Sequence, residues 1–241
     1  MNTTGQEFHI GGNEKGLSPE EQLDQLSWYI REHYPEPNNP EDLDRWIAHL
    51  PDRITHAAMM MLGSAVDHTM PGVVFLGNVT PTDIPELGAV QFTPSNPTGA
   101  WAISCHGEGG DLALENFWRP EVAAAAELSG TTILDIGYPD NADQIAAAIH
   151  YINAPQITVW AASSAAPFAI AIHSLIDALL LTRPRGALPD SESWPPTCIQ
   201  VNRGDIAPQG EVLEYLSDHL ISTPEVARQR IQDAANFLAS R

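Results

Sequence analysis

The stretch ITVWAASSAAPFAIAI, residues 157–172, has the pattern of a β-strand that ends where a helix begins. Two serines, Ser163 and Ser164, lie at the junction, and small residues flank them on both sides. A sharp strand-to-helix turn needs small neighbours, because the strand and the helix approach each other closely there. The stretch therefore predicts a buried strand, a tight turn that carries a serine, and a helix that follows directly.

Strands and helices alternate on both sides of this junction. Short apolar runs bounded by turn residues predict strands, and the alanine-rich segments between them predict helices. The expected strands lie within residues 72–79, 88–94, 99–111, 131–139, 157–160, 177–184 and 195–205. The expected helices lie at residues 119–130, 141–152 and 164–176. This alternation predicts an α/β fold with a mostly parallel sheet that is covered by helices on both faces.

The first part of the chain has a different character. Residues 1–16 are rich in glycine and polar groups and predict a flexible N-terminus. Residues 17–34, 40–50 and 52–70 each contain an expected helix, and Ser18 followed by Glu21 has the pattern of a capping box. We therefore divide the chain into a flexible N-terminus (1–16), a helical segment (17–70) and an α/β core (71–241).

Composition excludes several classes of protein. The 241 residues carry a net charge of −20 with only 11 basic side chains, so we expect no nucleic-acid partner. The chain shows no signal-peptide pattern and no apolar run of membrane-spanning length, which predicts a cytoplasmic protein.

Cys105 and Cys198 lie in apolar, strand-like runs. We expect two buried free thiols, although the sequence leaves a disulfide open.

The serine junction is one of three turns that follow the carboxyl ends of expected strands, where ligands bind in open α/β sheets. Ala161 and Ala165 flank Ser163 with the spacing of a nucleophile elbow, and a frame centred on Ser164 also fits. Either serine could instead cap the helix.

The other two turns add groups that suit acyl transfer. The glycine-rich turn at residues 106–110, HGEGG, can direct backbone N–H groups at a developing oxyanion, or it can be a plain tight loop. Asp205 follows the strand within residues 195–205, where a carboxylate can orient a histidine, although Gly-Asp pairs are common in turns. None of the histidines has a second His or Cys at metal-ligand spacing, so we predict no metal.

Together these segments resemble the α/β-hydrolase superfamily from about residue 73 to residue 241, and within it the hormone-sensitive-lipase-like esterases. Residues 104–111, SCHGEGGD, are similar to the His-Gly-Gly-Gly oxyanion motif of that family. Residues 161–165, AASSA, are similar to its Gly-x-Ser-x-Gly elbow, and residues 195–205 to the strand that bears the triad acid. The helices of residues 17–70 correspond in position to the family's N-terminal cap. The resemblance implies a small-molecule ester or acyl substrate and no cofactor.

The same resemblance implies a role for each site residue. Ser163 is the nucleophile, Asp205 the acid and His219 the general base, in the chain order of the family. The expected oxyanion hole consists of the backbone N–H groups of Glu108, Gly109 and Ser164. The remaining residues of the glycine-rich motif are His106, Gly107 and Gly110.

The sequence departs from the family pattern at the elbow, at the oxyanion turn and near the C-terminus. Alanine replaces both elbow glycines, and Glu108 stands where glycine is usual. The C-terminal region is shortened, because only residues 206–218 separate Asp205 from His219. A parallel crossover normally needs about a dozen residues or more. Residues 211–218 are therefore either a last strand reached by a bare extended segment, or a helix that holds His219 away from the serine.

Three functional hypotheses follow from these residues. The first is a serine ester hydrolase that forms an acyl-enzyme on Ser163. The second is an acyltransferase that uses the same residues, and the third is a non-catalytic binding or scaffold protein with this fold. We favour the hydrolase, because the serine, the acid, the histidine and the oxyanion-type turn occur in the expected order. The sequence leaves a homodimer open.

Overall fold

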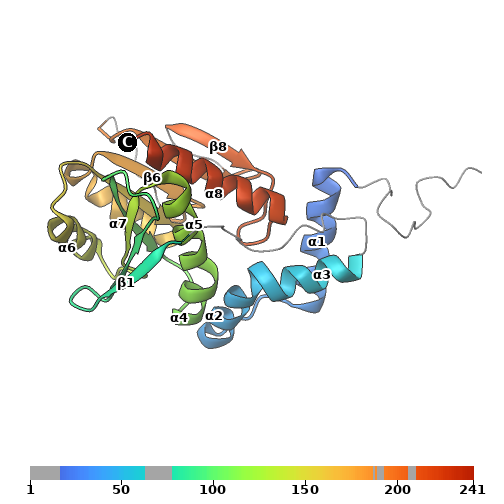
Figure 1. The fold of residues 1–241 in the computed structure, drawn as a ribbon. Helices are drawn as coiled ribbons and strands as arrows, with labels where there is room; N and C mark the ends of the chain where they lie inside the picture. The colour runs from blue at the N-terminus through green and yellow to red at the C-terminus, as the bar shows by residue number, and fades with distance from the viewer. Residues whose placement is uncertain (1–16, 63–77, 187, 189–192, 206–209) are drawn as a thin grey trace, which may run out of the picture.

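The computed structural model describes residues 17–62, 78–186, 188, 193–205 and 210–241. In this part of the chain one eight-stranded sheet runs in the order β1-β2-β4-β3-β5-β6-β7-β8. Figure 1 shows the fold, with β1, β6 and β8 labelled among the strands. β1 pairs antiparallel with β2, β2 pairs antiparallel with β4, and all other neighbours are parallel. The strands are β1 (Thr80–Ile84), β2 (Ala89–Thr93), β3 (Trp101–His106), β4 (Thr132–Asp135), β5 (Ile157–Ala162), β6 (Ala178–Thr182), β7 (Thr197–Asn202) and β8 (Glu211–Tyr215). The prediction of a mostly parallel sheet is confirmed, whereas most of the strand expected at 72–79 lies outside the described residues.

Helices cover both faces of the sheet. The longer helices of the core are α5 (Arg119–Ser129), α6 (Ala142–Ile152) and α8 (Pro224–Ala239). The shorter helical elements are α4 (Asp111–Ala113), η3 (Leu114–Trp118), η4 (Ser163–Ala165), α7 (Ala166–Ala171) and η5 (His173–Leu175). The continuous helix predicted over 164–176 is therefore wrong in its length, because Ile172 leaves helical geometry at φ −106° and ψ 18°.

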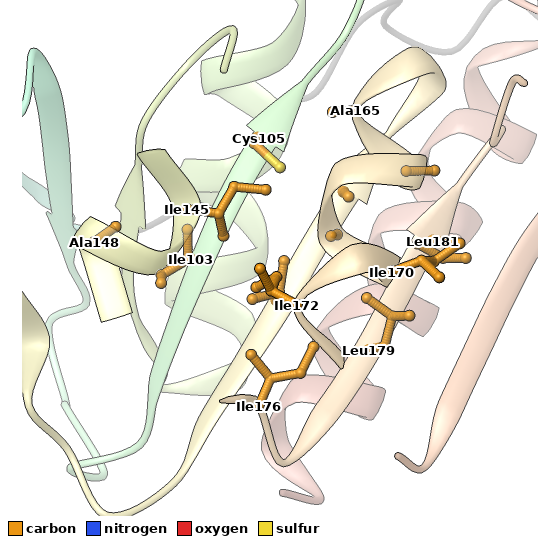
Figure 2. Packing of buried hydrophobic residues seen from close by; sticks show 14 of the residues in the cluster. Ile103, Cys105, Ile145, Ala148, Ala165, Ile170, Ile172, Ile176, Leu179 and Leu181 are labelled. Atoms are coloured by element: carbon orange, nitrogen blue, oxygen red, sulfur yellow. The ribbon is translucent and has the colours of Figure 1, made fainter. Parts of the chain in front are cut away.

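Two apolar layers flank the sheet, and β5 contributes to both. All six residues of β5 are buried, and its side chains alternate between the two faces as strand geometry requires. Val159 and Ala161 pack in the layer beneath α6 and α7, part of which Figure 2 shows. Trp160 and Ala162 pack in the opposite layer with α5 and α8. The central strand therefore holds the serine turn between two packed layers.

Both cysteines are buried free thiols, as expected. Burial raises the pKa of Cys198 to about 12 and that of Cys105 further still, so neither thiol is a reactive nucleophile at neutral pH.

The N-terminal segment contains the helices α1 (Pro19–His33), α2 (Pro40–His49), η1 (Leu50–Ile54) and α3 (Thr55–Leu62). We call residues 17–62 the cap segment. The predicted capping box of α1 is present, with reciprocal hydrogen bonds between Ser18 and Glu21. The apolar cluster of the cap segment includes Phe117 and Ile221 from the core, so the two parts pack together. The predicted flexible residues 1–16 and the end of the third expected helix lie outside the described residues.

The last strand resolves the ambiguity over residues 211–218. Residues 211–215 form β8, which pairs parallel to β7 with Asn202 opposite Tyr215. His219 therefore lies in the loop between β8 and α8 and not on a helix. Among the described residues, no helix is long and apolar enough to cross a membrane.

Candidate active site

Ser163 occupies a strained backbone position at the carboxyl end of β5. Its φ is +53°, and in the described part of the chain the other non-glycine residues with a positive φ are Asn153 and Arg183. A left-handed conformation costs about 1–2 kcal/mol for a residue with a Cβ, so the surrounding packing must hold it in place. The flanking alanines Ala161, Ala162 and Ala165 are all but fully buried, which explains why small side chains are needed here. Ser164, by contrast, is exposed, and its hydroxyl donates to the carbonyl of Gly107. The strained position therefore belongs to Ser163.

The glycine-rich turn packs directly against the serine turn. A Cβ at Gly107 would lie 2.4 Å from the backbone nitrogen of Ala165, so only glycine fits at this approach. Asp44 of the cap segment fixes the next part of the turn by accepting the backbone N–H groups of Gly110 and Ala113 at 2.7 and 2.8 Å. Tyr138 donates to the carbonyl of Gly110 at 2.8 Å. Sequence analysis gave neither Asp44 nor Tyr138 a role at this turn, because both lie far from it in the chain.

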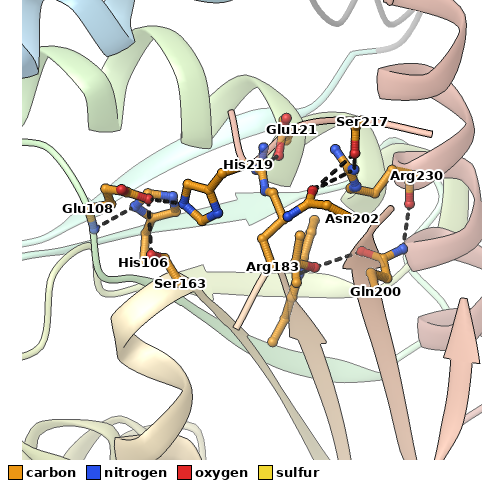
Figure 3. A network of polar contacts seen from close by, with 12 residues as sticks. His106, Glu108, Glu121, Ser163, Arg183, Gln200, Asn202, Ser217, His219 and Arg230 are labelled. Carbon is orange, nitrogen blue, oxygen red and sulfur yellow. Dashed lines mark hydrogen bonds and ion pairs between the residues drawn. The ribbon is translucent and has the colours of Figure 1, made fainter. Parts of the chain in front are cut away.

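The side chain of Glu108 lies between the serine and the histidine (Figure 3). Its Oε2 accepts the hydroxyl of Ser163 at 3.0 Å and lies 2.7 Å from Nε2 of His219. Its Oε1 accepts an N–H of Arg185 at 2.8 Å, and the backbone N–H of Arg185 donates to the carbonyl of Ser163. The sequence analysis gave a role only to the backbone of Glu108 and treated its carboxylate as a departure from the family pattern. A charged side chain in a glycine-rich turn beside the candidate nucleophile was the signal for a further role.

These contacts keep Glu108 ionised. Burial alone would raise the pKa of this carboxyl, but the hydrogen bond and charge of His219, together with Arg185 and Ser163, lower it to about 2. Ser163 is only 2% exposed. The nucleophile candidate is thus buried against a negatively charged carboxylate, which opposes the formation of a second negative charge nearby.

His106 contacts the same turn from the interior of the protein. It is buried, its ring centroid lies 4.8 Å from that of Trp118, and its Nδ1 accepts the backbone N–H of Glu108 at 3.0 Å. This N–H was expected to serve the oxyanion hole, but here it is directed at His106. The backbone of Ser164 does lie against the turn, because a Cβ at Gly107 would be 2.6 Å from its nitrogen. Gly109 and Ser164 therefore remain the oxyanion-hole candidates in this conformation.

We expect His106 to make the protein less stable in acid. Burial and the charge of Arg183 lower the pKa of His106 from 6.5 to about 3. Below pH 6.5 the unfolded chain binds a proton on this ring while the native state does not, so stability falls as the pH falls through this range. The loss is on the order of 2 to 3 kcal/mol between pH 6.5 and pH 4.5. Urea unfolding of His106→Asn across this range should show a correspondingly flatter pH dependence. His150→Asn, at an exposed position on α6, should keep the wild-type slope, and an equal slope in all three proteins contradicts the prediction.

Asp205 is not brought to His219. Its Oδ2 accepts the backbone and side-chain N–H groups of Asn202 at 3.3 and 2.9 Å, and the residue is exposed. The carboxylate that contacts His219 comes instead from Glu108. Of the three residues expected to form a triad, Ser163 and His219 both contact a fourth residue, Glu108. Asp205 lies just after the end of β7, where it contacts Asn202. No group of three or more His, Cys, Asp and Glu side chains among the described residues could hold a metal ion.

A second polar network anchors the histidine loop to the sheet (Figure 3). Ser217 donates to Oδ1 of Asn202 at 3.0 Å and accepts an N–H of Arg230 at 2.6 Å. Both Asn202 and Arg230 are buried, and Arg230 comes from α8. These contacts tie the residue two positions before His219 to the core.

Comparison with known structures defines the fold. An esterase from the bacterial hormone-sensitive lipase family matches with a TM-score of 0.60 and 16% identity, over 94% of this chain and 99% of that chain. An esterase/lipase from an uncultured bacterium matches with a TM-score of 0.62 and 13% identity, over 93% and 99% of the two chains. No family model matches the sequence, and no curated protein matches it. The chain therefore has the α/β-hydrolase fold. Its arrangement is similar to that of hormone-sensitive-lipase-like esterases, at identities that define the fold alone.

Proposed function

We propose that this protein is a serine hydrolase that cleaves small carboxylic esters through an acyl-enzyme on Ser163. The observation that carries the proposal is the strained backbone of Ser163 at the end of β5, together with the nearby His219. The carboxylate of Glu108 contacts both side chains. Strain of this kind is maintained at functional sites, and a serine held on a sharp strand-to-helix turn suits nucleophilic attack. Esterases and lipases among the structural neighbours support the same reaction class.

The proposed reaction has two acyl-transfer steps. The Oγ of Ser163 forms a bond to the ester carbon, and His219 takes the hydroxyl proton and returns it to the leaving alcohol. Water then attacks the acyl carbon, and His219 takes a proton from it and returns that proton to Oγ of Ser163 as the bond between Oγ and the acyl carbon breaks, which releases the carboxylic acid. Backbone N–H groups of Gly109 and Ser164 stabilise the negative oxygen of each tetrahedral intermediate. Asp205 has no part in this scheme, because its carboxylate is held by Asn202.

Glu108 must move during this reaction. In the structure, Nε2 of His219 is directed at the Glu108 carboxylate and not at the serine. Transfer of the serine proton to His219 requires that this carboxylate leave the space between them. The proposed cycle therefore starts from a resting arrangement, and the contacts of Glu108 with Arg185 and His219 support it.

The direct test is covalent labelling of the wild-type protein with a fluorophosphonate, followed by peptide mass spectrometry. We expect one adduct, on Ser163, together with hydrolysis of p-nitrophenyl esters of short acids. The butyrate is a suitable first substrate, because crystals of the structural neighbour EstE5 were soaked with it. A folded wild-type protein that is neither labelled nor active on these esters contradicts the proposal.

Glu108→Gln is expected to label about tenfold faster than the wild type. Two unit charges about 5 Å apart repel by roughly 3 kcal/mol at an effective dielectric constant of about 20, and Arg185 and His219 screen part of this repulsion. Glutamine keeps the size of the side chain and removes its charge. Glu127→Gln is the matched control, because Glu127 hydrogen-bonds Ser95 and not the site. A tenfold slower reaction of Glu108→Gln would instead assign the carboxylate a role as base or orienting acid.

A further inference from the structure

The loop that carries His219 is bound to the cap segment through one carboxylate. Ser27 of α1 donates to Oδ2 of Asp218 at 2.7 Å, and Arg31 of the same helix pairs with the same oxygen. Arg203 lies 3.4 Å from Oδ1 of Asp218 and also pairs with Asp24 of α1 at 2.7 Å. Asp218 therefore joins the helix of the cap segment to the residue next to the candidate base. Ser27 is fully enclosed at 1% exposure, which makes its contact with Asp218 part of a packed interface and not a surface pair.

Apolar contacts bind the same loop to the cap segment. Ile221 is buried within the apolar cluster of α1, α2 and α3, and Leu216 and Leu220 pack against that cluster. A backbone hydrogen bond from Asp218 to the carbonyl of Ile221, at 2.9 Å, closes a short turn that contains His219. The turn thus has its apolar side chains in the cap cluster, while His219 reaches Glu108.

The core holds the start of this loop through Ser217. Among the described residues, the side-chain partners of Asp218 are Ser27 and Arg31 of α1 and Arg203, which itself pairs with α1. The apolar cluster around Ile221 consists mainly of cap-segment residues, with Ala113 and Phe117 from the core. If α1 moves away from the core, the turn loses the contacts of Asp218 with Ser27 and Arg31 and the apolar contacts that the cap segment makes with it.

We propose that Asp218 is a positioning residue, through which helix α1 places His219 beside Glu108 in the candidate active site, so that docking of the cap segment and assembly of the base are one event. This inference rests on the proposed function for its effect on catalysis. The placement of the His219 ring can nevertheless be measured without any reaction.

The test compares Asp218→Asn with wild type. Asparagine keeps the shape of the side chain but loses the charge that pairs with Arg31 and Arg203. We expect the maximal labelling rate of Ser163 and kcat to fall about tenfold with KM nearly unchanged, because the base is misplaced while the rest of the site is intact. We also expect the imidazole ¹⁵N and ring ¹H signals of His219 to shift. Arg45→Gln is the matched control, because Arg45 pairs with Glu41 and Asp42 of its own helix α2 and should leave the rates and His219 signals as in wild type.

Ser27→Ala is the second variant and removes one neutral donor to Asp218 without changing any charge. It should shift the His219 signals in the same direction as Asp218→Asn by a smaller amount, which covers the case in which Asp218→Asn does not fold. The inference is overturned if the His219 signals of both variants are the same as in wild type. If Asp218→Asn does not fold, unchanged His219 signals in Ser27→Ala alone overturn it. If the wild-type protein is not labelled at Ser163 at all, the proposed function fails, whereas the His219 signals still decide the positioning role.

Discussion

Ser163→Ala is expected to lower fluorophosphonate labelling and ester hydrolysis by roughly 1,000-fold or more, because it removes the atom that forms the acyl-enzyme. The fold should change little. The Ser163 hydroxyl donates to Glu108, and this carboxylate keeps its contacts with His219 and Arg185 after the substitution. Alanine must still adopt the left-handed φ, as serine does in the wild type. Steady-state hydrolysis of p-nitrophenyl butyrate and intact-protein mass spectrometry measure the effect.

Ser164→Ala is the matched control for this prediction. It removes a hydroxyl one residue away, which donates to the carbonyl of Gly107, but it keeps the backbone N–H proposed for the oxyanion hole. We expect its activity to stay within a few-fold of wild type. Loss of labelling in Ser164→Ala with retention in Ser163→Ala would place the nucleophile in the other frame of the AASSA stretch.

Gly107→Ala is expected to destabilise the protein by about 3 kcal/mol or more and to abolish labelling of Ser163. The added Cβ would stand 2.3 Å from Oγ of Ser164 and 2.4 Å from the backbone nitrogen of Ala165. A side chain could rotate away, but the backbone at the start of the serine turn cannot move without changing the position of Ser163. Overpacking at a backbone contact therefore affects stability and nucleophile geometry together. Thermal unfolding followed by circular dichroism, with labelling measured below the transition, tests both effects.

Gly99→Ala separates this clash from the general effect of replacing a glycine. Gly99 has φ +92°, so alanine is strained there, but no atom lies within 4 Å of its added Cβ. We expect a loss of about 1–2 kcal/mol and unchanged labelling at Ser163. If both variants lose the same stability and both are still labelled, the contact between Gly107 and the serine turn does not determine the position of Ser163.

Local sequence signals were sufficient for most of the architecture. The apolar runs at 99–111 and 195–205 became β3 and β7, and the capping pattern at Ser18 and Glu21 formed at the start of α1. The serine turn was predictable for the same reason, since its small flanking residues are neighbours in the chain. Such features depend on side-chain period and on contacts over a few residues, which a sequence displays directly.

The assembly of the candidate site depended on contacts between distant segments. Glu108 meets Ser163 across 55 positions and His219 across 111, and no local pattern specifies the direction of its side chain. The same holds for Asp205, whose expected partner is a histidine on another strand end but whose actual partner is Asn202, three residues away.

Local patterns along the chain specify a mostly parallel α/β sheet with a helical N-terminal segment, and a serine on a tight turn at the end of a buried strand. Which carboxylate reaches His219, and that α1 holds the loop that carries it, follow from contacts that form only in the folded molecule. The physical reason is that secondary structure follows from local periodicity and backbone preference. The direction of a polar side chain at a strand end follows instead from the donors that remote segments bring to it.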